Sequence, residues 1–258
     1  RHNWVYNYYR LKCKICGHEF KHVLAREFQC PKCFPSGSLV ENKIIDYIGS
    51  RGFKVEQGRK DLLGGKREID IYLPDLKIGF EYNGLYWHCF PFRKRKYHYR
   101  KTFDALKHGI KLYHIWEHFD EKSVKSKIDN ILGVTKNKIF ARNLSFSSEG
   151  YPSFFDDNHL HKQSASSKFY FGLKDKNNNF VSMMSFNSVK GKTLELMRFA
   201  SLRENVVVGG FSKILKYAIP ILQKEGYNKI ATFAYTDWAP DYKDTVYYKN
   251  GFTFEGHT

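Results

Sequence analysis

The chain has 258 residues, 42% of them hydrophobic and 17% aromatic, which is enough for one large or two modest packed domains. Its formal net charge is +17. A chain this basic repels itself unless it meets a polyanion, so we expect a nucleic-acid partner. The sequence shows neither an apolar run that could span a membrane nor a signal-peptide pattern at its start, so no membrane partner is expected.

Four of the five cysteines form two close pairs near the start of the chain. Cys13 and Cys16 are separated by two residues, and Cys30 and Cys33 repeat that spacing further on. The pattern is typical of zinc ribbons, in which four thiolates complete a tetrahedral shell. We therefore predict a structural zinc ribbon over residues 1–36, with redox dithiols as the alternative. Such thiols suit a reducing cell interior, so a cytoplasmic location is expected.

A helix is predicted from about Leu39 to the glycines that begin at Gly49. Its apolar residues recur at helical spacing, and Ser38 followed by Glu41 three residues later forms a capping box. The carboxylate of Glu41 has two compatible roles: it caps this helix, and it stands at the top of a helix that packs beside the next strands. A short strand is expected at Phe53–Gln57.

The next stretch predicts a β-hairpin, with strands at residues 68–73 and 77–80 and a Pro-Asp turn between them. Asp70 lies inside the first strand, and Glu81 lies at the end of the second. Carboxylates on paired strands repel each other, and a divalent cation removes that repulsion. The hairpin therefore predicts a divalent-metal site; the alternative is an edge hairpin with solvated acids.

Beyond the hairpin the chain becomes strongly basic. Lys and Arg alternate with Tyr over residues 91–101, where His98 and Lys101 lie one helical turn apart. The elements predicted next are a helix to about residue 107, a strand at Lys111–Trp116 and a helix at Ser123–Leu132. The order helix, three strands, helix, strand, helix predicts an α/β domain with a mixed central sheet over residues 37–134.

This region resembles a known class of nucleases. Asp70 begins the motif D-x-x-L-P, and Glu81 to His88 read E-Y-N-G-L-Y-W-H. The core is similar to that of PD-(D/E)XK nucleases. The motifs are similar to those of very short patch repair endonucleases and of phage homing endonucleases of the EDxHD type. The resemblance covers about residues 38–132, and it implies metal-dependent, site-specific cleavage of double-stranded DNA, as a nick or a double-strand break.

The resemblance also implies roles for individual residues. Asp70 corresponds to the metal-binding acid, with Mg²⁺ or Mn²⁺ as the ion, and Glu41 corresponds to the helix acid. His88 corresponds to the catalytic histidine, which moves protons to or from the reacting oxygens. Glu81 occupies the second acid position of the broader nuclease core, where it would share the metal, although the repair enzymes do not depend on an acid there.

Two further residues acquire roles from the same resemblance. His98 and Lys101 would contact the scissile phosphate. Asn83 stands where the broader class has a lysine, and in the repair-like branch a histidine takes over that function. Cleavage of both strands requires two active sites, so we expect either a homodimer or a monomer that nicks the DNA.

Residues 135–258 show a different pattern. The elements predicted there are a hairpin within 167–187, strands at Thr193–Ser201 and Lys229–Tyr235, and a strand, a Gly-Gly turn and an amphipathic helix within 206–222. This order is similar to that of GNAT-like acyltransferases, and so is the segment Y-Y-K-N-G-F that ends at Phe252. We expect an α+β domain that contacts DNA.

Three functions are compatible with these patterns. The first is a metal-dependent DNA endonuclease of the homing type, whose zinc ribbon and C-terminal domain extend its DNA footprint. The second is an acyltransferase acting on nucleic acid or a DNA-bound partner, with coenzyme A at the helix that follows Gly209. The third is a non-catalytic DNA-binding protein with a decayed nuclease core, against which the intact acidic and histidine positions argue.

Overall fold

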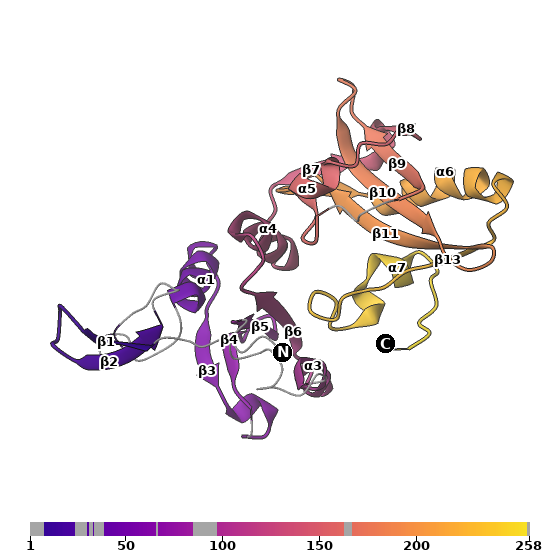
Figure 1. Ribbon diagram of the computed structural model, residues 1–258. Coiled ribbons are helices and arrows are strands. Elements are labelled where there is room, and N and C mark those ends of the chain that lie inside the picture. The colour runs from indigo at the N-terminus through magenta and orange to yellow at the C-terminus, as the bar shows by residue number, and fades with distance from the viewer. Residues whose placement is uncertain are drawn as a thin grey trace.

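The structure is a computed structural model with a mixed α/β architecture, as predicted (Figure 1). The residues that it describes are 8–23, 30, 33, 39–65, 67–84, 97–162 and 167–256. The predicted histidine His88 and the predicted cap Ser38 lie outside these ranges, as does most of the basic stretch before Tyr97. No helix within the described ranges combines the length and the apolar character needed to cross a bilayer.

The N-terminal element is a two-stranded antiparallel hairpin. Strand β1 (Tyr8–Lys12) pairs with β2 (Glu19–Val23). Between them the chain turns tightly, because the N–H of Cys13 donates to the carbonyl of His18 at 2.8 Å and the N–H of Gly17 donates to that of Cys13 at 2.9 Å. Gly17 has a φ of 71°, a conformation that favours glycine. The turn therefore presents the first cysteine pair at the end of a hairpin.

A four-stranded sheet forms the centre of the next lobe. Its strands, in spatial order, are β3 (Glu56–Arg59), β4 (Ile69–Leu73), β5 (Ile78–Asn83) and β6 (Lys111–Trp116). Strand β4 pairs antiparallel with both β3 and β5, and β5 runs parallel to β6. The predicted bounds of the first strand are wrong, since pairing with β4 begins at Glu56 while Phe53 and Val55 pack into the core as irregular chain.

Three helices of the described chain cover this sheet. They are α1 (Leu39–Ser50), α3 (Tyr97–Lys107) and α4 (Glu121–Ile131). Ile48 of α1 and Ile128 of α4 pack into one core with the sheet, whereas α3 packs into a separate core on the other face. Within the described residues the predicted order of helices and strands is confirmed, with a short 3₁₀ turn at Asp61–Leu63 added before β4.

Side chains of β5 alternate between the two faces, as a strand requires. Phe80 is fully buried in the core under α1 and α4. Gly79 and Glu81 therefore face α3. A Cβ atom at Gly79 would lie 2.7 Å from the Cδ1 of Leu112, so glycine allows neighbouring side chains to fill this face. Close packing here places the first turns of α3 directly over the end of β5.

The C-terminal lobe is built on a five-stranded sheet of order β13-β11-β10-β9-β8, with a two-stranded parallel sheet, β7-β12, beside it. The strands are β7 (Asn137–Phe140), β8 (Ser145–Ser147), β9 (Phe169–Lys174), β10 (Phe180–Ser188), β11 (Thr193–Ser201), β12 (Asn205–Val208) and β13 (Lys229–Ala231). The helices are α5 (Phe154–Asn158), α6 (Gly210–Lys224) and α7 (Val246–Lys249). The predicted hairpin and the Thr193–Ser201 strand are confirmed, and β13 ends four residues before the predicted Tyr235.

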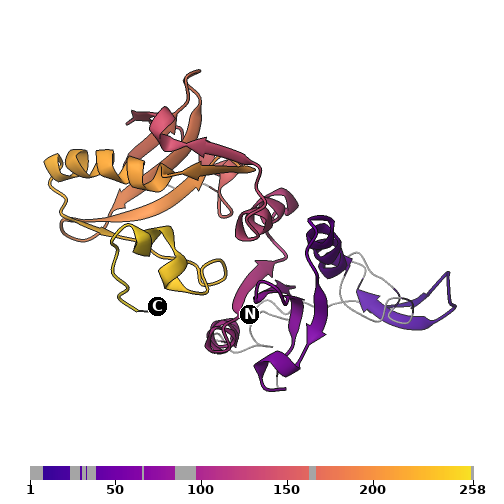
Figure 2. The same cartoon turned by 180° about the vertical axis from the view of Figure 1, so that it is seen from behind.

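The segment after β13 returns to the outer edge of β6 (Figures 1 and 2). The carbonyl of Asp237 accepts from the N–H of His114 at 3.0 Å, and its carboxylate accepts from the Nε1–H of Trp116 at 2.8 Å. Trp238 packs against the core under α1 and α4. A Lys111–Asp244 ion pair at 2.6 Å closes the far end. The two lobes therefore share a built interface along this strand.

Candidate metal centre and candidate catalytic pocket

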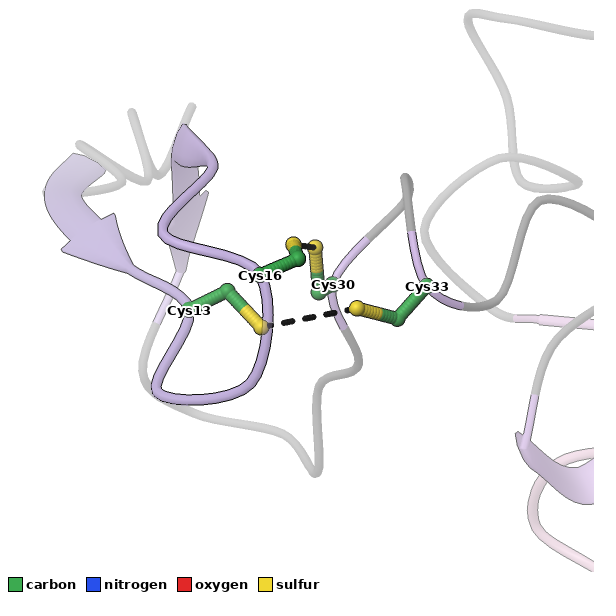
Figure 3. Close-up of side chains that lie close together, drawn as sticks. All are labelled: Cys13, Cys16, Cys30 and Cys33. Carbon is green, nitrogen blue, oxygen red and sulfur yellow. Dashed lines mark hydrogen bonds between the residues drawn. The ribbon is translucent and has the colours of Figure 1, made fainter.

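The four predicted cysteines come together in one cluster (Figure 3). Their sulfur atoms all lie within 4.8 Å of one another, with Cys13 to Cys33 at 3.7 Å and Cys16 to Cys30 at 3.6 Å. A tetrahedron with zinc–sulfur bonds of about 2.3 Å has sulfur–sulfur edges of about 3.8 Å. The cluster therefore has the dimensions of a tetrahedral thiolate site and could bind a metal ion such as zinc.

The protonation of these thiols agrees with a site that needs a cation. The pKa of Cys13 falls to about 6, chiefly because the backbone N–H of Cys16 donates to its sulfur. The pKa of Cys33 rises to about 12, chiefly because the thiol of Cys16 hydrogen-bonds to it. Several thiolates this close repel one another, and a bound metal ion allows all four to ionise.

Four of the residues predicted for catalysis line one open, mostly polar cavity of about 530 Å³. Glu41 comes from the first turn of α1, Asp70 from β4, Glu81 from β5 and Lys101 from α3. These residues span sixty positions of the sequence and meet because α1 and α3 both reach the same end of the sheet. His98 is not among the lining residues, and His88 lies outside the described residues.

The pairing of β4 with β5 changes character at this end of the sheet. The last regular pair is Ile71 with Phe80. Beyond it the N–H of Tyr82 donates to the Oδ2 of Asp70 at 3.0 Å, and the N–H of Asp70 donates to the Oε1 of Glu81 at 3.3 Å. Carboxylates thus replace backbone carbonyls as acceptors. The strands separate, and both acids are fixed on the face that the cavity exposes.

Lys101 and Glu81 form a buried ion pair within the cavity wall. The two residues are only 4% and 3% exposed. Burial and the negative charge of Asp70 together raise the pKa of Glu81 to about 8, against the opposing effect of Lys101. The pKa of Asp70 is also raised, chiefly by burial. Lys101 therefore supplies the positive charge for an acid pair that would otherwise resist ionisation.

The donor set of this cavity is that of a hard-cation site. Carboxylate oxygens are the ligands that Mg²⁺ and Mn²⁺ prefer, and such ions usually take one or two carboxylates and keep several waters. Asp70 and Glu81 present oxygens from adjacent strands, and the open side of the cavity leaves room for water and substrate. A divalent ion in this cavity stays a prediction, with Asp70 and Glu81 as the residues that would hold it.

His98 lies beside the cavity in an aromatic cluster. Its ring centroid is 5.0 Å from that of Trp116 and 5.3 Å from that of His114, each in an edge-on arrangement. These contacts place the ring between α3 and β6. Its contact with a scissile phosphate stays a prediction.

The sequence patterns did not predict a buried polar network that lies behind the cavity. The Nδ2 of Asn83 lies 3.1 Å from the Nδ1 of His114, and the Nε2 of His114 lies 2.8 Å from the Oγ1 of Thr102. The Thr102 hydroxyl also donates to the carbonyl of His98 at 3.1 Å. All three contacts are satisfied when His114 carries its proton on Nε2. The one available signal was a histidine in the middle of the apolar strand K-L-Y-H-I-W.

This network fixes the position of Lys101. Thr102 follows Lys101 on α3, and His114 is the β6 residue registered opposite Glu81. The bond between Thr102 and His114 therefore holds α3 against the sheet at the level of the Lys101–Glu81 pair.

Comparison of the chain with protein-family models, with curated proteins and with solved structures gives no match.

Proposed function

We propose that the protein is a metal-dependent endonuclease that hydrolyses phosphodiester bonds of double-stranded DNA. The observation that carries this proposal is the convergence of Glu41, Asp70, Glu81 and Lys101 on one open polar cavity. Acids from a helix and two strands, with a lysine beside them, are the arrangement expected for a nuclease of the PD-(D/E)XK type. A net charge of +17 supports a polyanionic substrate.

Each of the predicted catalytic residues has a task in this reaction. Asp70 and Glu81 would hold the divalent ion, which would supply Lewis-acid chemistry at the phosphoryl group and at an attacking water molecule. Glu41 contributes a further acidic oxygen from the start of α1. Lys101 places positive charge where negative charge develops at phosphorus, and so stabilises the transition state. His88 is proposed as the proton-transfer group, on the ground of the E-Y-N-G-L-Y-W-H motif.

A cleavage assay tests the proposal directly. The purified protein is incubated with plasmid carrying the DNA that flanks its own gene, in Mg²⁺, in Mn²⁺ or in chelator, and the products are resolved by strand. We expect site-specific nicks or double-strand breaks that require the metal. Absence of cleavage under every metal condition would support the non-catalytic DNA-binding alternative. The homing type and a phage origin are proposed only on the sequence resemblance.

One observation favours a second activity, in the C-terminal lobe. Strand β11 connects through β12 and α6 to β13, which runs parallel to β11, and Gly209 takes a φ of 75° between β12 and α6. A strand, a glycine turn and a helix N-terminus can hold a pyrophosphate such as that of coenzyme A. Calorimetric titration with acetyl-CoA tests the acyltransferase alternative, and saturable binding is the result that supports it.

Replacing Thr102 with valine is expected to slow cleavage about tenfold without weakening DNA binding, because α3 is released from His114 and Lys101 loses its position. Single-turnover measurements separate this loss of cleavage rate from a change in KM. Thr135→Val is the matched control, since its buried hydroxyl donates to the Oδ1 of Asn130 at 2.7 Å away from the cavity. Both variants lose about 1 kcal/mol of stability, but only Thr102→Val loses rate.

Thr102→Ser retains the hydroxyl and should restore the rate. If Thr102→Val and Thr135→Val cleaved equally fast, the positioning role of Thr102 would be disproved.

The raised pKa of Glu81 predicts a pH-dependent stability. A carboxyl whose folded pKa is about 8 binds its proton more tightly in the folded chain than in the unfolded chain. The folding free energy that protonated Glu81 contributes is therefore fully present below its unfolded pKa of about 4.5, and it is lost as the pH rises through the folded pKa of about 8. Relative to Glu81→Gln, the free energy of unfolding of the wild type should decrease as the pH rises from about 4.5 to about 8 and should stay constant above about pH 8. Urea unfolding in chelator, at about pH 5 and about pH 9, measures the difference; a difference that is constant over this range would contradict the prediction.

A further inference from the structure

A half-buried arginine in the C-terminal lobe lacks a counter-ion. The Nε of Arg198 donates to the carbonyl of Lys162 at 3.0 Å, and its Nη1 donates to the carbonyl of Met197 at 2.8 Å. Both partners are neutral, and no carboxylate of the described chain forms an ion pair with this guanidinium. The N–H groups of Nη2 form no hydrogen bond with the described residues and can therefore donate to a ligand. A guanidinium pinned in place by carbonyls and left without an acid is suited to receive an anion.

A β-bulge places this arginine. Ser185 of β10 pairs with Arg198 of β11, whereas the next pair is Phe186 with Leu196, so Met197 is the extra residue. Bulges redirect side chains and are frequent beside functional sites. Ser185, directly opposite Arg198, is 1% exposed, and its hydroxyl has no hydrogen-bond partner. A buried hydroxyl without a partner costs free energy, and a ligand that bonded to it would recover that cost.

The turn that holds Arg198 also carries a histidine with a defined tautomer. The N–H of His161 donates to the Nδ1 of His159 at 3.1 Å, so neutral His159 carries its proton on Nε2. No partner for this Nε2 is found among the described residues. The His161 ring is itself held, because it stacks on Tyr235 at 4.3 Å. Lys162 completes the turn at a φ of 54°, a strained conformation for a non-glycine residue.

We propose that Arg198, His159 and Ser185 together bind a phosphoryl oxyanion on the C-terminal lobe. A guanidinium, an imidazole N–H and a hydroxyl from two strands and a turn can each donate to a different oxygen of a tetrahedral anion, whereas a carboxylate has only two oxygens. The site lies outside the acidic cavity and does not depend on the proposed nuclease activity.

The electrostatics of the cluster agree with an anion site. The pKa of His159 is lowered to about 3, first by burial and then by the positive charge of Arg198. The pKa of His161 is lowered in the same way. The charges that act on these two rings are positive, and a bound dianion would offset them.

Two sources could supply the anion: a backbone phosphate of DNA and a small phosphoester. The full chain is titrated with inorganic phosphate, and the ring resonances of His159 and His161 are followed by NMR. We expect saturable shifts in wild type, about tenfold weaker binding in Arg198→Met, and a similar loss in Ser185→Ala. Ser185→Ala should leave the melting temperature unchanged or raised, because it removes no bond within the chain.

Arg142→Met is the matched control, because this exposed arginine of the same lobe changes the net charge equally. It should bind phosphate like wild type. Titration with a short DNA duplex then separates the sources: a loss of DNA affinity in Arg198→Met beyond that in Arg142→Met assigns the site to the DNA backbone, and unchanged affinity assigns it to a small phosphoester. Failure of phosphate to saturate, or equal losses in Arg198→Met and Arg142→Met, would overturn the proposal.

Discussion

Asp70→Asn is expected to abolish metal-dependent DNA cleavage while DNA binding survives. The amide keeps the shape of the side chain and can still accept from the N–H of Tyr82, so the strand end should stay intact. Under the proposed function, the lost charge weakens a ligand of the divalent ion, and such ions contribute several kcal/mol of transition-state stabilisation. The single-turnover rate should therefore fall by about 10³-fold or more. Plasmid nicking measures the rate, and fluorescence anisotropy measures binding.

Asp75→Asn is the matched control for this experiment. Asp75 lies in the exposed turn between β4 and β5, outside the cavity lining, so the same change of charge occurs on the same hairpin. This variant should cleave at the wild-type rate. If Asp70→Asn cut target DNA in Mg²⁺ as fast as Asp75→Asn, the cavity would not be the catalytic site.

Cys30→Ser is expected to release the metal and unfold the N-terminal hairpin. Cys30 is 6% exposed and is the most buried of the four thiols, so its loss removes both a ligand and the centre of the cluster. A hairpin this small has little apolar surface to bury, and metal binding in such sites supplies on the order of 10 kcal/mol of folding free energy. Elemental analysis should give one zinc per wild-type chain and none in the variant.

Amide hydrogen exchange distinguishes local from global unfolding in this variant. Protection should be lost in β1 and β2 and retained in the four-stranded sheet, which has its own core. Cys89→Ser is the control, because this cysteine belongs to neither pair, and it should retain one zinc per chain. A full zinc content in Cys30→Ser would disprove the four-cysteine site.

Local patterns predicted the elements that depend on neighbouring residues. Alternating side chains and turn residues gave the β4–β5 hairpin, and the bounds of Lys111–Trp116 and Thr193–Ser201 are confirmed. The first strand was misplaced because Phe53 and Val55 look like strand residues, although their burial comes from packing against the core and not from a ladder.

The arrangement of the candidate site depends on contacts that no local pattern contains. The acidic residues were identified because carboxylates stood in apolar strands, but the pairing of Lys101 with Glu81 requires α3 to cross the sheet at one level. That level is set by Thr102 and His114, which are distant in sequence from each other and from Glu81. His98 shared a helix with Lys101, yet its ring packs on Trp116.

The contact between Trp116 and Asp237 affects how the chain folds during its synthesis. The outer edge of β6 is an open strand edge until a segment 121 residues further along the chain arrives to cover it. During synthesis the nascent four-stranded lobe therefore exposes unpaired backbone groups while the whole C-terminal lobe is still being translated. A fragment that stops after α4 should fold its core and yet self-associate through this edge, so the C-terminal lobe protects the first lobe from aggregation.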